Sequence, residues 1–148
     1  MILENEHLLW IQNYLKEIYK KPILENFLGL QVVELKEGKV IFQTKIIDRH
    51  CNFYGFVHGG TLASISDIAM GISCITMEKR VVTIDMSTSY IKNAPEGSIL
   101  TAVGEVMSNG KTIMRAVGEI YNEQQILVRS QASYFVTGDF NANDFPLP

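Results

Sequence analysis

One acidic side chain lies inside a long apolar segment of the chain. Residues 59–77 form a nineteen-residue stretch in which Asp67, near the middle, is the only charged residue before Met77. Burying a carboxylate costs free energy that a purely structural role rarely requires, so Asp67 is a candidate for chemistry as a general base or a nucleophile. The alternative is an Asp67 side chain that points to solvent at the rim of a dimer interface.

The same segment begins with His58-Gly59-Gly60. If a helix starts here, the backbone N–H groups of its first turn have no intrahelical partner, and the helix dipole favours negative charge beside them. Glycine at this place also allows a ligand to approach closely. The sequence therefore combines backbone donors for a negative charge with a carboxylate eight residues after Gly59.

The elements that must position these residues follow from the spacing of apolar side chains. An amphipathic helix is predicted at residues 7–20, before Pro22, and a long buried helix follows His58. A turn at Glu37-Gly38 joins two strands into a hairpin, and four further strands follow the buried helix before a loose C-terminal tail. The six predicted strands are residues 30–36, 39–47, 80–92, 98–108, 111–121 and 126–137.

Composition places all these elements in a single domain over residues 1–148. Hydrophobic residues make up 47% of the chain and charged residues 20%, as in globular proteins. The net charge of -3 disfavours nucleic acids and anionic membranes as partners. Acidic residues replace the positive charge of a secretion signal, and two cysteines are too few for a disulfide scaffold, which predicts a cytoplasmic protein with reduced thiols. Asp67 and the hydroxyl side chains around it argue against a membrane span.

Consecutive strands joined by short turns pair antiparallel, and a very apolar helix needs a surface that nearly surrounds it. The predicted fold class is therefore α+β: a curved antiparallel sheet wrapped around one long buried helix, with an extra N-terminal helix. This arrangement resembles the hotdog fold. The residues that carry the resemblance are Asn52, Gly55, His58-Gly59-Gly60, Asp67 and the segment VVTIDMSTSYIKNAPEG from Val81.

The string N-x-x-G-x-x-H-G-G-x6-D is similar to that of the PaaI-type, 4-hydroxybenzoyl-CoA thioesterase-like enzymes of the 4HBT superfamily, and the resemblance covers about residues 22–137. It implies hydrolysis of an acyl- or aryl-CoA thioester to the free acid and CoA, with no cofactor and no metal. It further implies that the Gly59 N–H polarises the thioester carbonyl, that His58 shapes the turn and that Asn52 orients substrate or water. Asp67 is then the catalytic carboxylate, and Thr83 holds the attacking water.

Coenzyme A carries phosphates, so an acidic protein needs a local cationic surface to bind it. Lys92, Lys111 and Arg115 are candidates, although an ordinary surface charge is the more common role for any single Lys or Arg. The resemblance places nucleotide contacts at Lys92-Asn93 and at the Asn109-Gly110-Lys111 turn. Gly60 joins these as a substrate-binding residue through its place beside Gly59.

Helix geometry predicts that the site spans two chains. Gly59 and Asp67 lie about 12 Å apart along a straight helix, at about 1.5 Å per residue. An oxyanion donor and the acting carboxylate must both reach the same carbonyl group, at about 3 Å. Two antiparallel helices across a two-fold axis bring Gly59 of one chain toward Asp67 of the other, which predicts a homodimer, with a dimer of dimers as a further option.

Three other functions are compatible with parts of the pattern. A non-catalytic acyl-CoA-binding module is the main alternative, since fold does not imply activity. A hotdog dehydratase is another, but its arrangement of histidine and carboxylate is not evident. A metal site would have to use His50, Cys51, His58 and Asp67, whose spacing matches no familiar ligand pair.

Overall fold

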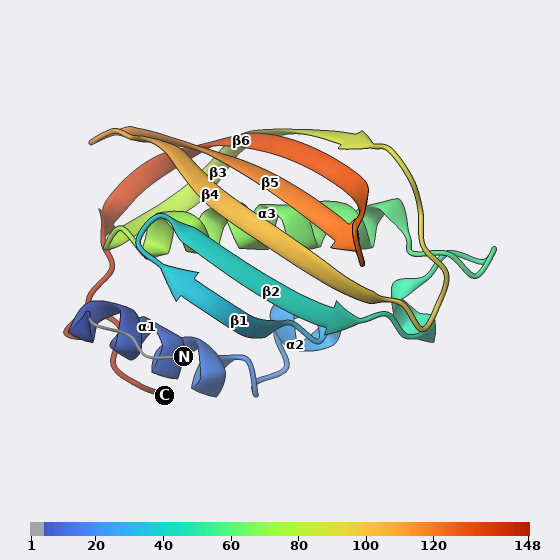
Figure 1. The fold of residues 1–148 in the computed structure, drawn as a ribbon. Helices are drawn as coiled ribbons and strands as arrows, with labels where there is room; N and C mark the ends of the chain where they lie inside the picture. Colours follow the sequence, from blue (N-terminus) through green and yellow to red (C-terminus); the bar gives the residue numbers. More distant parts are fainter. Residues whose placement is uncertain (1–4) are drawn as a thin grey trace.

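The computed structural model of the chain describes residues 5–148, so residues 1–4 of the predicted domain lie outside it. Six antiparallel strands form one sheet in the order β1-β2-β4-β5-β6-β3. Among the described residues no helix has the length and apolarity needed to span a bilayer. The elements are α1 (Glu6–Ile18), α2 (Leu24–Leu28), β1 (Gln31–Lys36), β2 (Lys39–Lys45), a 3-10 turn (Asp48–His50), α3 (Gly59–Ile75), β3 (Lys79–Tyr90), β4 (Ile99–Asn109), β5 (Ile113–Asn122) and β6 (Gln125–Asp139) (Figure 1).

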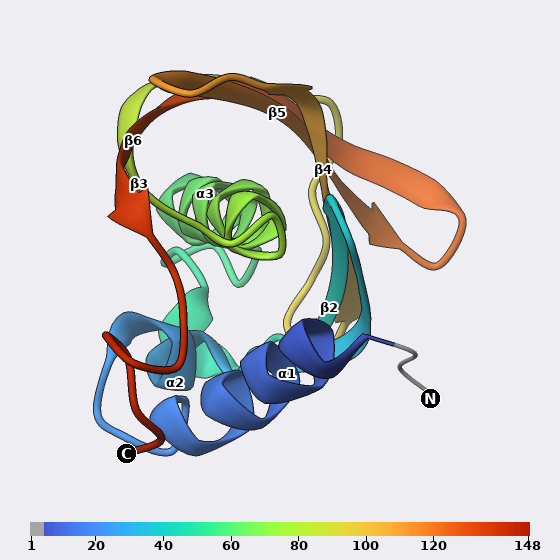
Figure 2. The ribbon, with the colours of Figure 1, turned by 90° about the vertical axis from the view of Figure 1, so that its left-hand side faces the viewer.

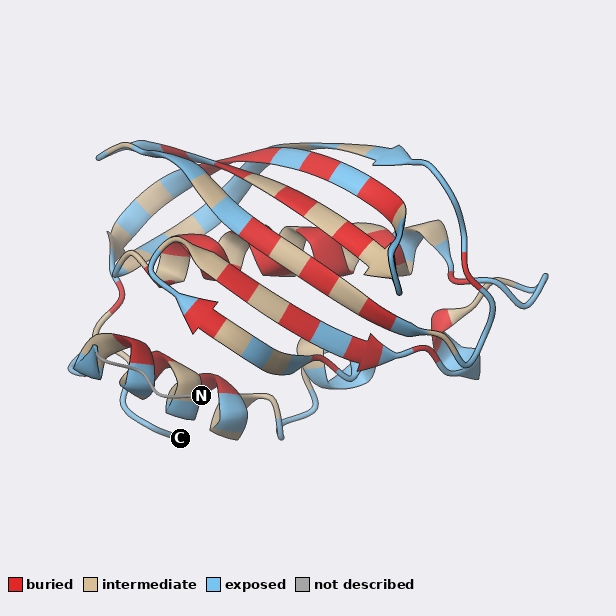
Figure 3. Cartoon of the chain, in the orientation of Figure 1, coloured by how far each residue is buried: buried red, intermediate tan, exposed pale blue. Residues whose placement is uncertain are grey.

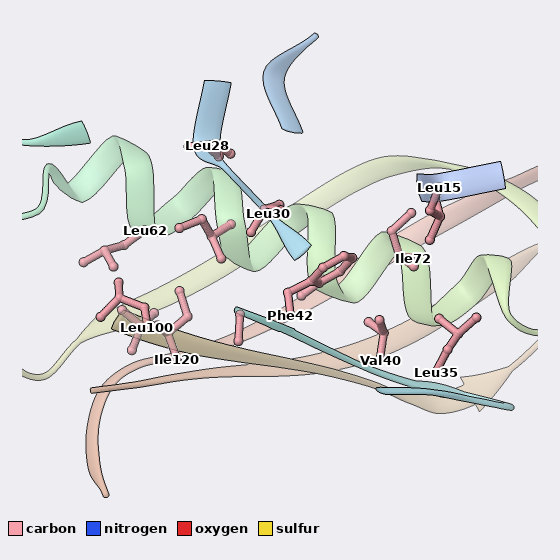
Figure 4. Close-up of a cluster of buried hydrophobic side chains, with 14 of the residues drawn as sticks. Leu15, Leu28, Leu30, Leu35, Val40, Phe42, Leu62, Ile72, Leu100 and Ile120 are labelled. Carbon is pink, nitrogen blue, oxygen red and sulfur yellow. The ribbon is translucent and has the colours of Figure 1, made fainter. Parts of the chain in front are cut away.

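The predicted α+β architecture is confirmed. The sheet curves around α3, while α1 and α2 lie below its open side (Figure 2). Buried and exposed residues alternate along the strands, as expected for a sheet with one face on a core and one face in water (Figure 3). The inner face and α3 share a core that includes Phe42, Leu62, Ile72, Leu100 and Ile120 (Figure 4).

Two glycines allow α3 to lie close against the sheet. Gly104 on β4 and Gly118 on β5 are cross-strand partners on the inner face. A Cβ atom at Gly104 would lie 2.1 Å from the backbone oxygen of Ala69, whereas one at Gly118 would lie 3.1 Å from Cγ of the Met70 side chain. The backbone of α3 therefore touches β4 at a point where no side chain fits.

The place of β3 differs from the simplest expectation for four strands joined by short turns. β3 pairs with β6 and forms an edge of the sheet, so residues 91–98 are a crossover to β4 rather than a hairpin turn. This crossover makes backbone hydrogen bonds to the loop before α3: the Val57 N–H donates to the Ala94 oxygen at 3.0 Å, and the Glu96 N–H donates to the Gly55 oxygen at 3.2 Å. These bonds hold the C-terminal end of β3 next to the N-terminal end of α3.

The C-terminal segment, expected to be loose, packs on α1. Phe140 is buried, and its ring lies 5.2 Å from that of Trp10 and 4.6 Å from that of Phe145, centroid to centroid. Tyr14 contributes a further edge contact to the Phe140 ring at 5.6 Å. Aromatic pairs at these distances are attractive beyond their burial, so the tail and α1 stabilise each other. The short helix α2 was not predicted. It follows α1 in the chain and contacts α3.

We expect Gly104→Ala to destabilise the protein far more than Gly118→Ala. At position 104 the new methyl group meets helix backbone, so α3 must move as a whole, and overpacking of this kind costs at least about 3 kcal/mol. At position 118 the flexible Met70 side chain can move aside, and a cost of about 1 kcal/mol is expected. Urea unfolding of both variants gives the two free energies, and equal losses would contradict this account of the helix contact.

Candidate active site

Asp67 faces β3 and β6 from the middle of α3. Its Oδ1 atom accepts hydrogen bonds from the Thr83 hydroxyl and the Tyr134 hydroxyl, each at 2.9 Å. The Tyr134 hydroxyl oxygen also lies 2.9 Å from the backbone oxygen of Asp67, so the two acceptors share its single hydrogen. Thr83 and Tyr134 are direct cross-strand partners, so one position of the sheet supplies both donors. The structure thus brings together Asp67 and Thr83, two of the predicted residues, and adds Tyr134.

Tyr134 is the site residue that the sequence analysis missed. Burial raises the pKa of its hydroxyl, and the neighbouring Asp67 carboxylate raises it further, so the group stays protonated and acts as a donor. Its position within a buried run of β6 is typical of plain core. The pairing register of β3 and β6 carries the information that was missing, because an inward-facing residue of β6 opposite Thr83 has to lie near Asp67.

A cavity of 170 Å³ opens beside this carboxylate. Asp67, Thr83 and Tyr134 supply its hydroxyl and carboxylate groups, and the rest of the α3 and β3 lining is glycine and aliphatic side chains. Glu25 on α2 brings a second carboxylate to the wall. The other lining residues are Ile68, Gly71, Ile72, Ile75, Val81 and Val82.

The N-terminus of α3 presents the predicted backbone donors. His58 is the N-cap residue in extended conformation, and its Nδ1 atom accepts the Gly60 N–H at 2.8 Å. Within residues 5–148 the Gly59 N–H has no hydrogen-bond acceptor. Tyr90, at the end of β3, donates its hydroxyl to the Gly59 oxygen at 3.2 Å and holds this turn on the sheet. A helix terminus with an unpartnered N–H is suited to bind a developing negative charge.

His50 is an anchor of the loop that leads into α3. It is 1% exposed, its Nδ1 accepts the Ile47 N–H at 3.1 Å, and its Nε2 lies 2.6 Å from the Phe27 oxygen at the end of α2. Its backbone oxygen accepts the His58 N–H at 3.0 Å and the Thr61 hydroxyl at 2.9 Å. Both ring nitrogens are therefore used in structural bonds, which leaves neither for a metal ion.

Asn52 stabilises the same loop at its tip. Its Oδ1 atom accepts the backbone N–H groups of Tyr54 and Phe56, at 3.0 and 3.2 Å. The side-chain oxygen is thus occupied by a local turn, and the amide NH₂ is the part of Asn52 that remains for a substrate. Phe53 and Tyr54 project from this turn, 89% and 72% exposed, with ring centroids 4.2 Å apart.

The predicted nucleotide-binding residues lie in three places. Asn93 is next to the α3 N-terminus, where its side-chain NH₂ donates to the Val57 oxygen at 3.1 Å, and Lys92 precedes it. Lys111 lies in the β4–β5 turn. Lys79, which follows the C-terminal end of α3, donates hydrogen bonds to Asn109 and Gly110 and so holds this turn near that end of the helix. These ends are about 25 Å apart along a helix of 17 residues. Arg115 lies on the outer face of β5, where it donates to the Ser133 hydroxyl at 3.3 Å.

The site thus has two halves within one chain. One half holds Asp67, Thr83 and Tyr134, and the other holds the Gly59 and Gly60 turn, about 12 Å away along the same helix. A carbonyl group placed against the Gly59 N–H is out of reach of the carboxylate of the same protomer. A carboxylate and backbone N–H donors are both groups that acyl transfer can use, and within one chain these two lie too far apart to act on the same carbonyl group.

Comparison with known proteins agrees with this chemistry. The model of the Thioesterase superfamily matches residues 54–129. Human "Acyl-coenzyme A thioesterase 13" is 29% identical over 106 residues, which are 70% of this chain and 76% of that protein. A hypothetical thioesterase from Streptococcus pneumoniae, solved with coenzyme A, superposes with a TM-score of 0.75 at 28% identity, covering 78% of this chain and 94% of that one. The Escherichia coli PaaI protein has the same fold, with a TM-score of 0.82 at 20% identity over 91% of this chain and 99% of that chain.

Replacing His50 by Ala should destabilise the protein and loosen the α3 N-terminus. The substitution leaves the Ile47 N–H and the Phe27 oxygen without their ring partners, at a cost of about 1–3 kcal/mol for each group that stays buried. Thermal unfolding should show a melting temperature lower by several degrees, and hydrogen exchange should become faster at Gly60 and Thr61. Unchanged exchange there would mean that His50 does not hold the turn.

Proposed function

This chain belongs to the thioesterase superfamily, and we propose that it hydrolyses acyl-CoA thioesters at a site that two copies of the chain build together. It is a thioester hydrolase with the hotdog fold. The observation that carries the proposal is the single charged side chain of α3: Asp67 lies beside a cavity, with its Oδ1 held by two hydroxyl groups. A carboxylate in this setting is suited to activate water at an acyl carbon.

The proposed reaction uses three groups of the chain. A water molecule donates one hydrogen bond to the Thr83 hydroxyl oxygen. It gives its other proton to the Asp67 carboxylate as the water oxygen bonds to the thioester carbon. The carbonyl oxygen becomes an oxyanion that accepts a hydrogen bond from the Gly59 N–H of the second copy of the chain. When the C–S bond breaks, the electron pair leaves with sulfur, and the proton held by Asp67 passes to the thiolate. The products are the free acid and the CoA thiol, and the carboxylate is regenerated.

Two features support a two-fold dimer as the active form. The first is the distance of about 12 Å between Gly59 and Asp67 on one helix, which an antiparallel second α3 removes. The second is β3, a twelve-residue edge strand whose outer backbone groups have no strand partner in the described chain. Val82 and Ile84 on this edge are 54% and 50% exposed. A long edge strand with exposed apolar side chains is suited to pair with a second copy.

The same dimer would gather the cationic groups for coenzyme A. Within one protomer Lys92 and Lys111 lie near opposite ends of α3. With Gly59 of one helix opposite Asp67 of the other, the C-terminal end of the second helix lies about 12 Å beyond the N-terminal end of the first, at the same end of the helix pair. Lys92 and Asn93 of one protomer then lie on the same side as Lys111 of the second, where they can share the phosphates of one nucleotide. Arg115, on the outer face, has no part in this arrangement.

The direct test measures release of free thiol from short, long and aromatic acyl-CoA thioesters. We expect Asp67→Asn to lower kcat by about 10³-fold, because general-base catalysis of this kind contributes 10²–10⁴-fold. Gly59→Pro should lower kcat by about 10²-fold, since proline fits the first helical position and the extended His58 before it but lacks the N–H. Gly59→Ala is the matched control: it keeps the N–H, and its Cβ would lie an ordinary 3.7 Å from the Tyr90 ring.

Near-normal turnover by folded Asp67→Asn would remove Asp67 from the mechanism. Equal losses in Gly59→Ala and Gly59→Pro would show that the side chain, rather than the N–H, matters at this position. Binding of acyl-CoA without hydrolysis by the wild type across the whole panel would overturn the proposed activity on CoA thioesters.

Mixed dimers test the shared site. Asp67→Asn and Gly59→Pro, each nearly inactive alone, should regain activity when mixed with subunit exchange. A mixed dimer has one site with both lesions and one with neither, so equal mixing restores about a quarter of the wild-type sites. Exchange is followed by mass spectrometry of differently tagged chains. Complete exchange without recovery would place the whole site within one chain.

A further inference from the structure

Tyr134 has a hydroxyl group that the proposed reaction does not use. Its side chain is 2% exposed and lies on the inner face of β6, against α3. Gly71, one helical turn after Asp67, lies against the ring, and a Cβ atom there would be in ordinary contact, 3.6 Å from Cε1 of Tyr134. The hydroxyl oxygen of Tyr134 lies 2.9 Å from both Oδ1 and the backbone oxygen of Asp67.

The two oxygens of the Asp67 carboxylate are in different situations. Oδ1 accepts from the Thr83 and Tyr134 hydroxyls, whereas no hydrogen bond to Oδ2 is found in the part of the chain that the structure describes. Hydrogen bonds to a carboxylate oxygen are charge-assisted and fix its position. They also occupy its lone pairs, so the second oxygen is the one left to take a proton or to form a bond.

A bulge in β3 keeps Asp85, the acidic side chain of this strand, away from Asp67. The register shifts between Thr83 and Asp85, so Thr83 pairs with Tyr134 and Asp85 pairs with Ser133 on the next position of β6. Ser133 accepts from Arg115 on the outer face, and Asp85 lines the same outer groove. Without the bulge, Thr83 and Asp85 would lie on one face, and a second carboxylate would face Asp67.

From these contacts we propose that Tyr134 is a positioning residue that, together with Thr83, holds Oδ1 of Asp67 and leaves Oδ2 as the oxygen that reacts. The inference rests on the proposed function of Asp67. Because the hydroxyl also bonds to the helix backbone at Asp67, it couples the direction of the side chain to the position of α3. Tyr134 touches neither substrate nor water in this role, and acts only through Asp67.

The test variant is Tyr134→Phe, which keeps the ring and removes the hydroxyl that donates to Asp67. We expect kcat for a good acyl-CoA substrate to fall by about tenfold or more, with KM changed by less than about twofold, since the carboxylate is misdirected while the binding surfaces stay in place. Tyr19→Phe is the matched control. Tyr19 is partly buried, and within residues 5–148 its buried hydroxyl has no hydrogen-bond partner, so the loss of this hydroxyl should leave kcat unchanged.

A double variant separates positioning from stability. If Tyr134 acts through the carboxylate, Tyr134→Phe should have no further effect on residual kcat in the Asp67→Asn background. A loss of the same size in both backgrounds, or a loss fully explained by the fraction of unfolded protein, would overturn the inference. So would wild-type kcat in Tyr134→Phe while Asp67→Asn is inactive. Wild-type activity of Asp67→Asn itself would instead overturn the proposed function.

Discussion

The depth at which α3 lies in the curved sheet is the constraint on which the site depends. Contact between the Ala69 backbone and Gly104 of β4 sets this depth on one side of the helix. On the opposite side it determines whether Asp67 reaches Thr83 and Tyr134. Burial of large side chains such as Leu62 and Ile65, worth about 1.5–3 kcal/mol each, offsets the cost of drawing a carboxylate toward the core. Packing on one face of α3 thus positions chemistry on the other.

The N-terminus of α3 is held by a different set of contacts. His50 ties the preceding loop to α2, the crossover 91–98 pairs with residues 55–57, and Tyr90 binds the Gly59 oxygen. None of these contacts belongs to the sheet ladder. They hold the backbone donors in a fixed direction before a substrate arrives, which is what electrostatic stabilisation of an oxyanion requires. Three separate elements thus hold the loop that leads to Gly59, the residue proposed to supply the oxyanion donor.

Local pattern was enough to predict part of this site. A charged residue within an apolar helix and two glycines at the helix start are visible without a fold, and they indicated Asp67 and Gly59. Tyr134 is 67 residues from Asp67, and its role depends on the β3–β6 register, which short-range periodicity does not contain. The edge position of β3 was hidden for the same reason. His50 looks like a ligand in sequence because only the fold shows that both of its ring nitrogens are already bonded.

Strand β3 links an unpaired edge of the sheet to the proposed site. Its inner side supplies Thr83, its ladder with β6 uses one edge only, and its other edge carries exposed Val82 and Ile84. The carboxylate beside Thr83 lacks an oxyanion donor within reach on its own helix. We infer that one two-fold axis next to β3 pairs the β3 edges of two chains. The same axis places a second α3 antiparallel to the first and so brings an oxyanion donor to the carboxylate. A substitution that weakens pairing along this edge should then lower kcat as strongly as it weakens dimer assembly, although it touches no reacting group.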